Sequence, residues 1–140
     1  MTLYLDSSVL VSAVMAEPRS PEARAVLGDV GSVVASAWTF VEAASALSIK
    51  VRIKAITGAE QEVALRLLDR LQGASVPLIG ITEAHLREAA RYAGRHELNL
   101  RGGDALHVAL AGSIGAMLVT GDEPMSRAAE RLGVAVRLLA

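Results

Sequence analysis

Short apolar runs alternate with longer amphipathic segments along this 140-residue chain, and this alternation restricts the fold more than any other feature. Strands separated by helices favour a mostly parallel sheet that helices cover on both faces. The pattern predicts strands at 3–6, 32–36, 76–81, 116–120 and 134–138, and helices at 7–15, 21–27, 38–54, 58–72, 82–95, 103–114 and 123–132. We therefore predict a three-layer α/β/α fold whose central sheet has about five strands.

Several residues predict where these elements begin and end. Ser20 is expected to cap the helix at 21–27, with Pro21 at its first position, and Thr82 to cap the helix at 82–95. Pro77 interrupts the start of the third strand because proline has no N–H to donate. Glycines are expected to end three of the helices: Gly73, Gly115 and Gly133.

Composition supports one globular domain spanning residues 1–140. Hydrophobic residues make up 52% of the chain but aromatic residues only 3%, so the core must be built from aliphatic side chains. Because the chain has no cysteine, it has no disulfides, no thiolate zinc site and no cysteine nucleophile. We see no signal peptide and no membrane-spanning run, and expect a cytoplasmic protein. The net charge of −1 means that any nucleic-acid binding must rest on a local basic patch and on metal ions.

Four acidic residues stand in unusually apolar surroundings. Asp6 directly follows the run LYL, and Asp122 directly follows MLVTG. Glu42 lies within TFVEAASAL and Asp104 within RGGDALHVALA, two largely apolar helical segments. A buried carboxylate is unfavourable unless it is paired, hydrogen-bonded or bound to a metal. These four residues are therefore the candidate functional side chains.

Each of the four also has an ordinary structural interpretation. Asp6 and Asp122 can cap the helices that follow them, and Asp104 can complement a helix dipole in a first turn. Glu42 has no capping role, so its alternative is a salt bridge on a half-exposed face.

The predicted topology nevertheless brings the four together. Asp6 and Asp122 follow strands, and ligands of open α/β sheets bind at the carboxyl ends of the strands. If the first and fourth strands are neighbours, these two residues face each other, and Glu42 and Asp104 can reach the same edge. Crowded carboxylates raise one another's pKa values, a conflict that a divalent cation relieves. Oxygen ligands favour Mg²⁺ or Mn²⁺ over zinc.

The motifs around these residues resemble those of the PIN domain, and more narrowly those of the VapC-type toxins of type II toxin–antitoxin systems. YLDSSVL resembles the opening strand of that family with its first catalytic Asp, and FVEAASAL resembles the helix that carries its Glu. LRGGDALHVALA resembles the helix of the next Asp, and LVTGDEPMSRAAERLGVAV resembles the closing segment. The resemblance covers nearly the whole chain. One departure is Ser8, which stands where many relatives have Asn.

The resemblance implies a single PIN domain at 1–140 that acts as a metal-dependent endoribonuclease and hydrolyses phosphodiester bonds of RNA. It implies that Asp6, Glu42, Asp104 and Asp122 form a catalytic site for Mg²⁺ or Mn²⁺, with Asp6 and Asp104 as the first choices for direct ligands. By the same resemblance, Ser7 and Thr120 are supporting polar residues. The implied partners are RNA, a VapB-type antitoxin and a second copy in a homodimer. The apolar helices of 38–72 either contact that antitoxin or only cover the sheet.

Six further side chains are open to two interpretations each. Three arginines either contact the RNA backbone or are ordinary solvated charges: Arg19, Arg24 and Arg101. His107 lies one turn after Asp104 and is either a general acid or a structural residue. Two aromatic residues either stack on bases or pack in the fold: Trp38 and Phe40.

Other protein classes remain as alternatives. A receiver-like phosphoacceptor domain needs a lysine at a late strand end, and this chain has no lysine after Lys54. A phosphatase with an aspartyl nucleophile needs a second Asp two residues after the first, where Ser8 stands. A catalytically silent PIN-like interaction module does not need the four acidic residues, and their presence argues against it.

Overall fold

A computed structural model describes residues 1–29 and 32–140. Its sheet has five strands, all parallel, in the order β3-β2-β1-β4-β5. The strands are β1 (Leu3–Leu5), β2 (Val33–Ser36), β3 (Leu78–Ile79), β4 (Met117–Thr120) and β5 (Val136–Leu138). The helices are α1 (Ser7–Val14), α2 (Ser20–Leu27), α3 (Ala37–Arg52), α4 (Gly58–Leu71), α5 (Glu83–Ala93), the 3₁₀ turn η1 (His96–Leu98), α6 (Gly102–Ser113) and α7 (Glu123–Arg131). The predicted fold class is confirmed, and β1 and β4 are neighbours, as the predicted site requires.

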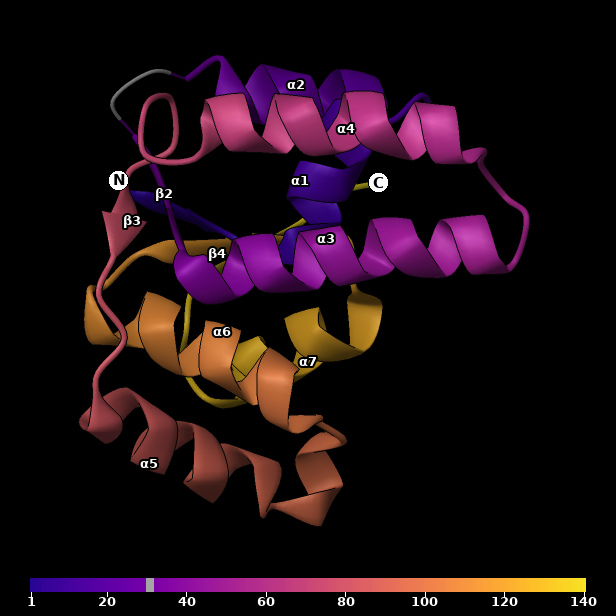
Figure 1. Ribbon diagram of the computed structural model, residues 1–140. Helices are drawn as coiled ribbons and strands as arrows, with labels where there is room; N and C mark the ends of the chain where they lie inside the picture. The colour runs from indigo at the N-terminus through magenta and orange to yellow at the C-terminus, as the bar shows by residue number, and fades with distance from the viewer. Residues whose placement is uncertain (30–31) are drawn as a thin grey trace.

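The helices form one layer on each face of the sheet (Figure 1). Helices α1 to α4 pack together over one face, while α6 and α7 cover the other and α5 packs outside α6. Side chains of β1 alternate between the two layers: Leu5 belongs to the core under α1 to α4, and Tyr4 to the core under α6 and α7. The central strand thus contributes side chains to both hydrophobic cores.

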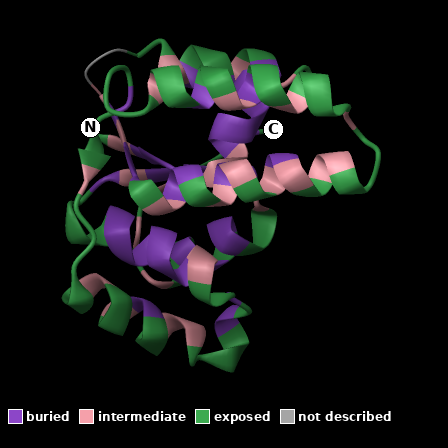
Figure 2. Cartoon of the chain, in the orientation of Figure 1, coloured by how far each residue is buried: buried purple, intermediate pink, exposed green. Residues whose placement is uncertain are grey.

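Helices α1 and α6 are the most extensively buried helices of the described chain. Every residue of α6 from Ala105 to Ala111 is buried, and so are the residues of α1 from Val9 to Val14 (Figure 2). A helix that is buried around most of its circumference needs packing partners on the side away from the sheet as well as the sheet itself. Helix α5 supplies the outer cover for α6, and α2 and α3 pack against α1.

Two sequence predictions about element ends were wrong. Ser20 is the first residue of α2, and Arg19 is the N-cap; the Ser20 hydroxyl instead accepts from the Glu17 N–H at 2.9 Å and donates to the Met15 carbonyl at 2.6 Å. The predicted strand 76–81 contracts to two residues because Pro77, at this edge of the sheet, joins the ladder only through its carbonyl, which accepts from Ala35.

The other predicted ends hold to within two residues. Thr82 caps α5, and Gly73, Gly115 and Gly133 end their segments in the left-handed region, with φ of 79°, 64° and 74°. Within the described residues, no helix combines the length and apolar character that a bilayer crossing requires.

A substitution at Leu47 on α3 measures how much the core under α1 to α4 contributes to stability. Its side chain is fully buried in the cluster that joins α1, α3 and α4. We expect Leu47→Ala to lower the free energy of unfolding by about 2–5 kcal/mol, measured by urea denaturation with Trp38 fluorescence. Val63→Ala on the exposed side of α4 is the control and should change it by less than about 0.5 kcal/mol. Equal losses in the two variants would contradict this assignment of the core.

Candidate active site

Asp6 directly follows the central strand β1 and is almost completely buried, with 2% of its surface exposed. Its Oδ1 accepts from Ser8 Oγ at 2.6 Å and from the Val9 N–H at 3.3 Å, and its Oδ2 accepts from Thr120 Oγ1 at 2.5 Å. Burial raises the pKa of Asp6, while the nearby His107 and these hydrogen bonds oppose the rise. Asp6 therefore caps α1, and it does so as a buried carboxylate held on both oxygens.

The end of β4 is joined to the end of β1 by the same hydroxyls. Thr120 Oγ1 accepts from the Asp122 N–H at 2.9 Å, and Ser8 Oγ accepts from the Gly121 N–H at 2.8 Å. Asp122 caps α7, because its Oδ1 accepts from the Met125 N–H at 2.9 Å. Asp6 and Asp122 consequently stand at adjacent strand ends, linked through Thr120.

Glu42 is held from α6 rather than by a surface cation. Its Oε1 is hydrogen-bonded to Nε2 of His107, whose ring is fully buried. The other ring nitrogen, Nδ1, lies 2.9 Å from the Tyr4 hydroxyl, which also lies 2.9 Å from Ser36 Oγ and 3.3 Å from Thr39 Oγ1. Burial raises the pKa of Tyr4 to about 12, so the phenol stays neutral. With both nitrogens engaged, His107 fits the structural interpretation.

Asp104 lies in the first turn of α6, where burial and the charges of the other three carboxylates raise its pKa. Its pKa is raised to about 6, first by burial and then by the negative charges of Asp122 and Glu42, with a smaller contribution from Asp6. His107 acts in the opposite direction. The four carboxylates predicted from sequence therefore lie close enough to share one electrostatic environment.

Gly103 allows α6 to approach α3 at this site. A Cβ at Gly103 would lie 2.8 Å from Glu42 Oε2 and 2.9 Å from Trp38 Cζ2. The Gly103 carbonyl accepts from the Trp38 indole N–H at 3.3 Å. Trp38 thus packs against the start of α6. Phe40 is buried in the core under α1 to α4, so both aromatic residues have packing roles.

The donor set fits a hard divalent cation, although the described residues contain no ready-made cluster of three metal-ligating side chains. Hydroxyls occupy the oxygens of Asp6, and His107 occupies one oxygen of Glu42. Asp104 and Asp122 line an open hollow of about 530 Å³. Carboxylate oxygens at such a site favour Mg²⁺ or Mn²⁺.

Some of the predicted supporting and basic residues lie at the site, and others do not. Thr120 bonds to Asp6, but the serine that does so is Ser8; none of the side-chain hydrogen bonds among the described residues involves Ser7. Arg24 donates to the carbonyls at the end of α1, which makes it structural. Arg101 lines the hollow of Asp104 and Asp122, and Arg19 lies against Gly121.

Sequence patterns did not identify four of these residues as part of the site: Tyr4, Ser8, Gly103 and Gly121. Of these four, only Ser8 could have been found from the sequence, because it stands where many members of the resembled family have a polar Asn.

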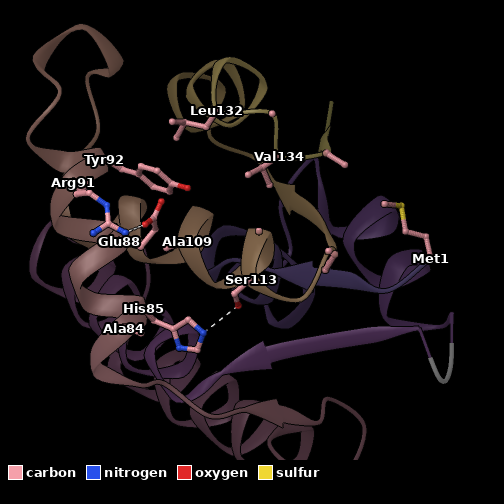
Figure 3. Close-up of a pocket in the computed structure, with 15 residues that line it drawn as sticks. Met1, Ala84, His85, Glu88, Arg91, Tyr92, Ala109, Ser113, Leu132 and Val134 are labelled. Atoms are coloured by element: carbon pink, nitrogen blue, oxygen red, sulfur yellow. Dashed lines mark hydrogen bonds and ion pairs between the residues drawn. The ribbon is translucent and has the colours of Figure 1, made fainter.

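A second hollow, of about 760 Å³, lies between α5, α6 and the segment before β5 (Figure 3). His85 and Ser113 are hydrogen-bonded on its wall at 3.1 Å, and Glu88 pairs there with Arg91. None of the four candidate carboxylates lines it. The hollow lined by Asp104 and Asp122 is therefore the candidate reaction site.

Comparisons with known proteins agree with the observed fold. The family model of the PIN domain matches residues 3–131. Three solved structures are similar in fold. PAE2754 from Pyrobaculum aerophilum is 22% identical, with a TM-score of 0.70 and coverage of 94% of this chain and 93% of that one. FitAcB from Neisseria gonorrhoeae is 21% identical, with a TM-score of 0.68 and 96% coverage of each chain. VapBC-1 from nontypeable Haemophilus influenzae is 15% identical, with a TM-score of 0.66 and coverage of 99% and 98%. No curated protein matches the sequence.

The raised pKa of Asp104 predicts a pH-dependent stability. A carboxyl whose pKa is higher in the folded state stabilises the fold below its unfolded pKa, near 3.8, and this contribution is lost as the pH rises through about 6. In chelator at pH 7.5, Asp104→Asn should therefore raise the melting temperature by about 2–6 °C, and by less at pH 4. Asp69→Asn, an exposed change on α4, should show no such difference. A lower melting temperature for Asp104→Asn at pH 7.5 would contradict the crowded site.

The Tyr4 hydroxyl tests the buried network. Tyr4→Phe removes only the oxygen and leaves His107 Nδ1 without that partner. We expect a loss of about 1–3 kcal/mol in the free energy of unfolding by urea denaturation. Tyr92→Phe, at a half-buried residue on α5, is the matched control and should stay within about 0.5 kcal/mol. If both variants are as stable as the wild type, the network contributes little.

Proposed function

This chain belongs to the PIN domain family, and we propose that it is a metal-dependent endoribonuclease whose site is formed by Asp6, Glu42, Asp104 and Asp122. The observation that carries the proposal is the placement of the carboxylates: Asp6 and Asp122 are joined through Thr120 at adjacent strand ends, and Asp104 lines the same hollow as Asp122. Four carboxylates that share one field at the carboxyl ends of β1 and β4 suit a divalent cation and, through it, a phosphodiester substrate.

Asp6 and Asp104 are the proposed direct ligands, and Glu42 and Asp122 complete the set or position water. Mg²⁺ or Mn²⁺, when bound, would lower the pKa of a water molecule and stabilise negative charge on the scissile phosphate. Ser8 and Thr120 keep both oxygens of Asp6 in a fixed orientation. His107 does the same for Glu42.

We further propose that the protein is the toxin of a toxin–antitoxin pair and acts as a homodimer. The likeness of its motifs to VapC-type toxins supports this proposal, together with the fold shared with VapBC-1 and FitAcB. A VapB-type antitoxin would dock on α3 and α4, where large apolar side chains are exposed, among them Val41, Ile49, Ile53 and Val63. An RNA target implies a cytoplasmic site of action.

The test compares the wild-type protein with Asp6→Asn on a structured RNA mixture in Mg²⁺, in Mn²⁺ and in chelator. Asparagine is also a good N-cap, so the variant should fold. We expect cleavage by the wild type only with metal, and at least about a 100-fold loss in the variant. Asp69→Asn serves as the control and should cleave like the wild type.

The alternative outcomes separate the remaining functions. Equal cleavage by the wild type and Asp6→Asn would contradict the site assignment. Absence of cleavage, and of any metal-dependent rise in melting temperature, would favour the catalytically silent interaction module.

A further inference from the structure

Arg19 lies closer to the acidic site than its place in the chain suggests. It precedes α2, yet its guanidinium lies against Gly121, the residue between Thr120 and Asp122. A Cβ built on Gly121 would be 2.6 Å from Arg19 Nη1, 3.2 Å from its Cζ and 3.3 Å from Ser8 Oγ. A side chain at position 121 would therefore displace the guanidinium, and only glycine leaves room for it.

The turn that carries Arg19 is held in place by several hydrogen bonds. The Ser20 hydroxyl bridges the Glu17 N–H and the Met15 carbonyl. Arg24 donates to the Met15 carbonyl at 2.9 Å. The Arg19 carbonyl itself accepts from the Ala23 N–H at 2.9 Å. A ligand that binds Arg19 would thus meet a backbone that is already ordered, which reduces the entropy lost on binding.

Six of the other thirteen lysines and arginines form an ion pair with a carboxylate in the described residues, and Arg19 does not. Acidic groups within 4.0 Å pair with seven basic side chains of the described part: Lys50, Arg87, Arg91, Arg95, His107, Arg127 and Arg137. Arg24 is bound to backbone carbonyls. Across residues 1–29 and 32–140, Arg19 has no such ion pair. Its charge is available to an anion beside the site.

We propose that Arg19 binds a phosphate oxygen of the RNA strand at the acidic site, and that Gly121 provides the space for its guanidinium. The inference rests on the proposed ribonuclease function and names a residue that holds its substrate. Carboxylates repel a phosphodiester, and the chain has a net charge of −1, so the substrate needs a local cation. A guanidinium suits this role because its planar donors match two phosphate oxygens.

The first experiment measures binding separately from cleavage. A short fluorescein-labelled single-stranded RNA is titrated in chelator, and anisotropy reports binding. Arg19→Ala should weaken binding about 10-fold and lower the slope of log affinity against log salt by about 0.7. Arg66→Ala, an exposed arginine on α4 without an ion pair in the described part, is the control and should leave both unchanged. With Mg²⁺ present, kcat/KM for RNA cleavage should fall in Arg19→Ala by a similar factor.

The second experiment uses Gly121→Ala, which displaces the guanidinium without removing it. The atom displaced is the end of a flexible side chain, so the melting temperature should change little. We expect the binding defect of Arg19→Ala, and no further loss when the two changes are combined. Arg19→Lys, which keeps the charge without the planar donors, should be intermediate.

The outcomes separate this inference from the proposed function. Normal RNA binding and cleavage by Arg19→Ala would overturn the inference even if cleavage needs metal and Asp6. A defect in Gly121→Ala that adds to that of Arg19→Ala would also overturn it, because the two changes would then act independently. If no RNA is cleaved but both variants bind RNA weakly and non-additively, the phosphate contact holds and the ribonuclease proposal fails.

Discussion

The buried carboxylate of Asp6 is the constraint on which the rest of the site depends. An almost fully buried carboxylate is unfavourable unless its oxygens are satisfied, and here the partners come from three places: Ser8, the Val9 N–H and Thr120. Thr120 can donate only if β1 and β4 are neighbours whose ends lie level, as the pairing of Leu5 with Val119 ensures. The same bonds fix where Asp122 begins α7. The hydrogen bonds that satisfy Asp6 therefore also position Asp122.

The other two carboxylates depend on Tyr4, which lies in β1 two residues before Asp6. Tyr4 and Asp6 fall on the same side of β1, because side chains alternate along a strand. Through His107, Tyr4 supports Glu42 from α3, and Gly103 lets the start of α6, with Asp104, approach that carboxylate. Leu5, between them, anchors the opposite core. Tyr4 and Leu5 of the central strand, together with Asp6 directly after it, thus connect the site to both layers of the fold.

Sequence patterns were sufficient for the fold class and for the neighbourhood of Asp6 and Asp122, because apolar runs mark strands and parallel strands end at one edge. They could not reveal the Tyr4–His107–Glu42 network, whose members are 103 and 65 residues apart and meet only through tertiary packing. The same holds for Gly103 and Gly121, whose importance lies in what a Cβ would strike. Ser20 was misassigned as a cap because a hydroxyl before Pro21 has several possible backbone partners, and the preceding turn provided better ones.

The charge distribution limits how this chain can hold a nucleic acid. Several arginines are paired with a glutamate on the same helix, such as Arg87 with Glu83 and Arg127 with Glu123, so they add little field of their own. With a net charge of −1, the molecule as a whole does not attract a polyanion over long distances. For the proposed ribonuclease function, binding would then depend on a few contacts close to the scissile phosphate and on the metal ions. A proposed RNA substrate held at so few points would be selected by whether its backbone fits the hollow lined by Asp104 and Asp122, which favours an exposed loop or single strand over a regular duplex.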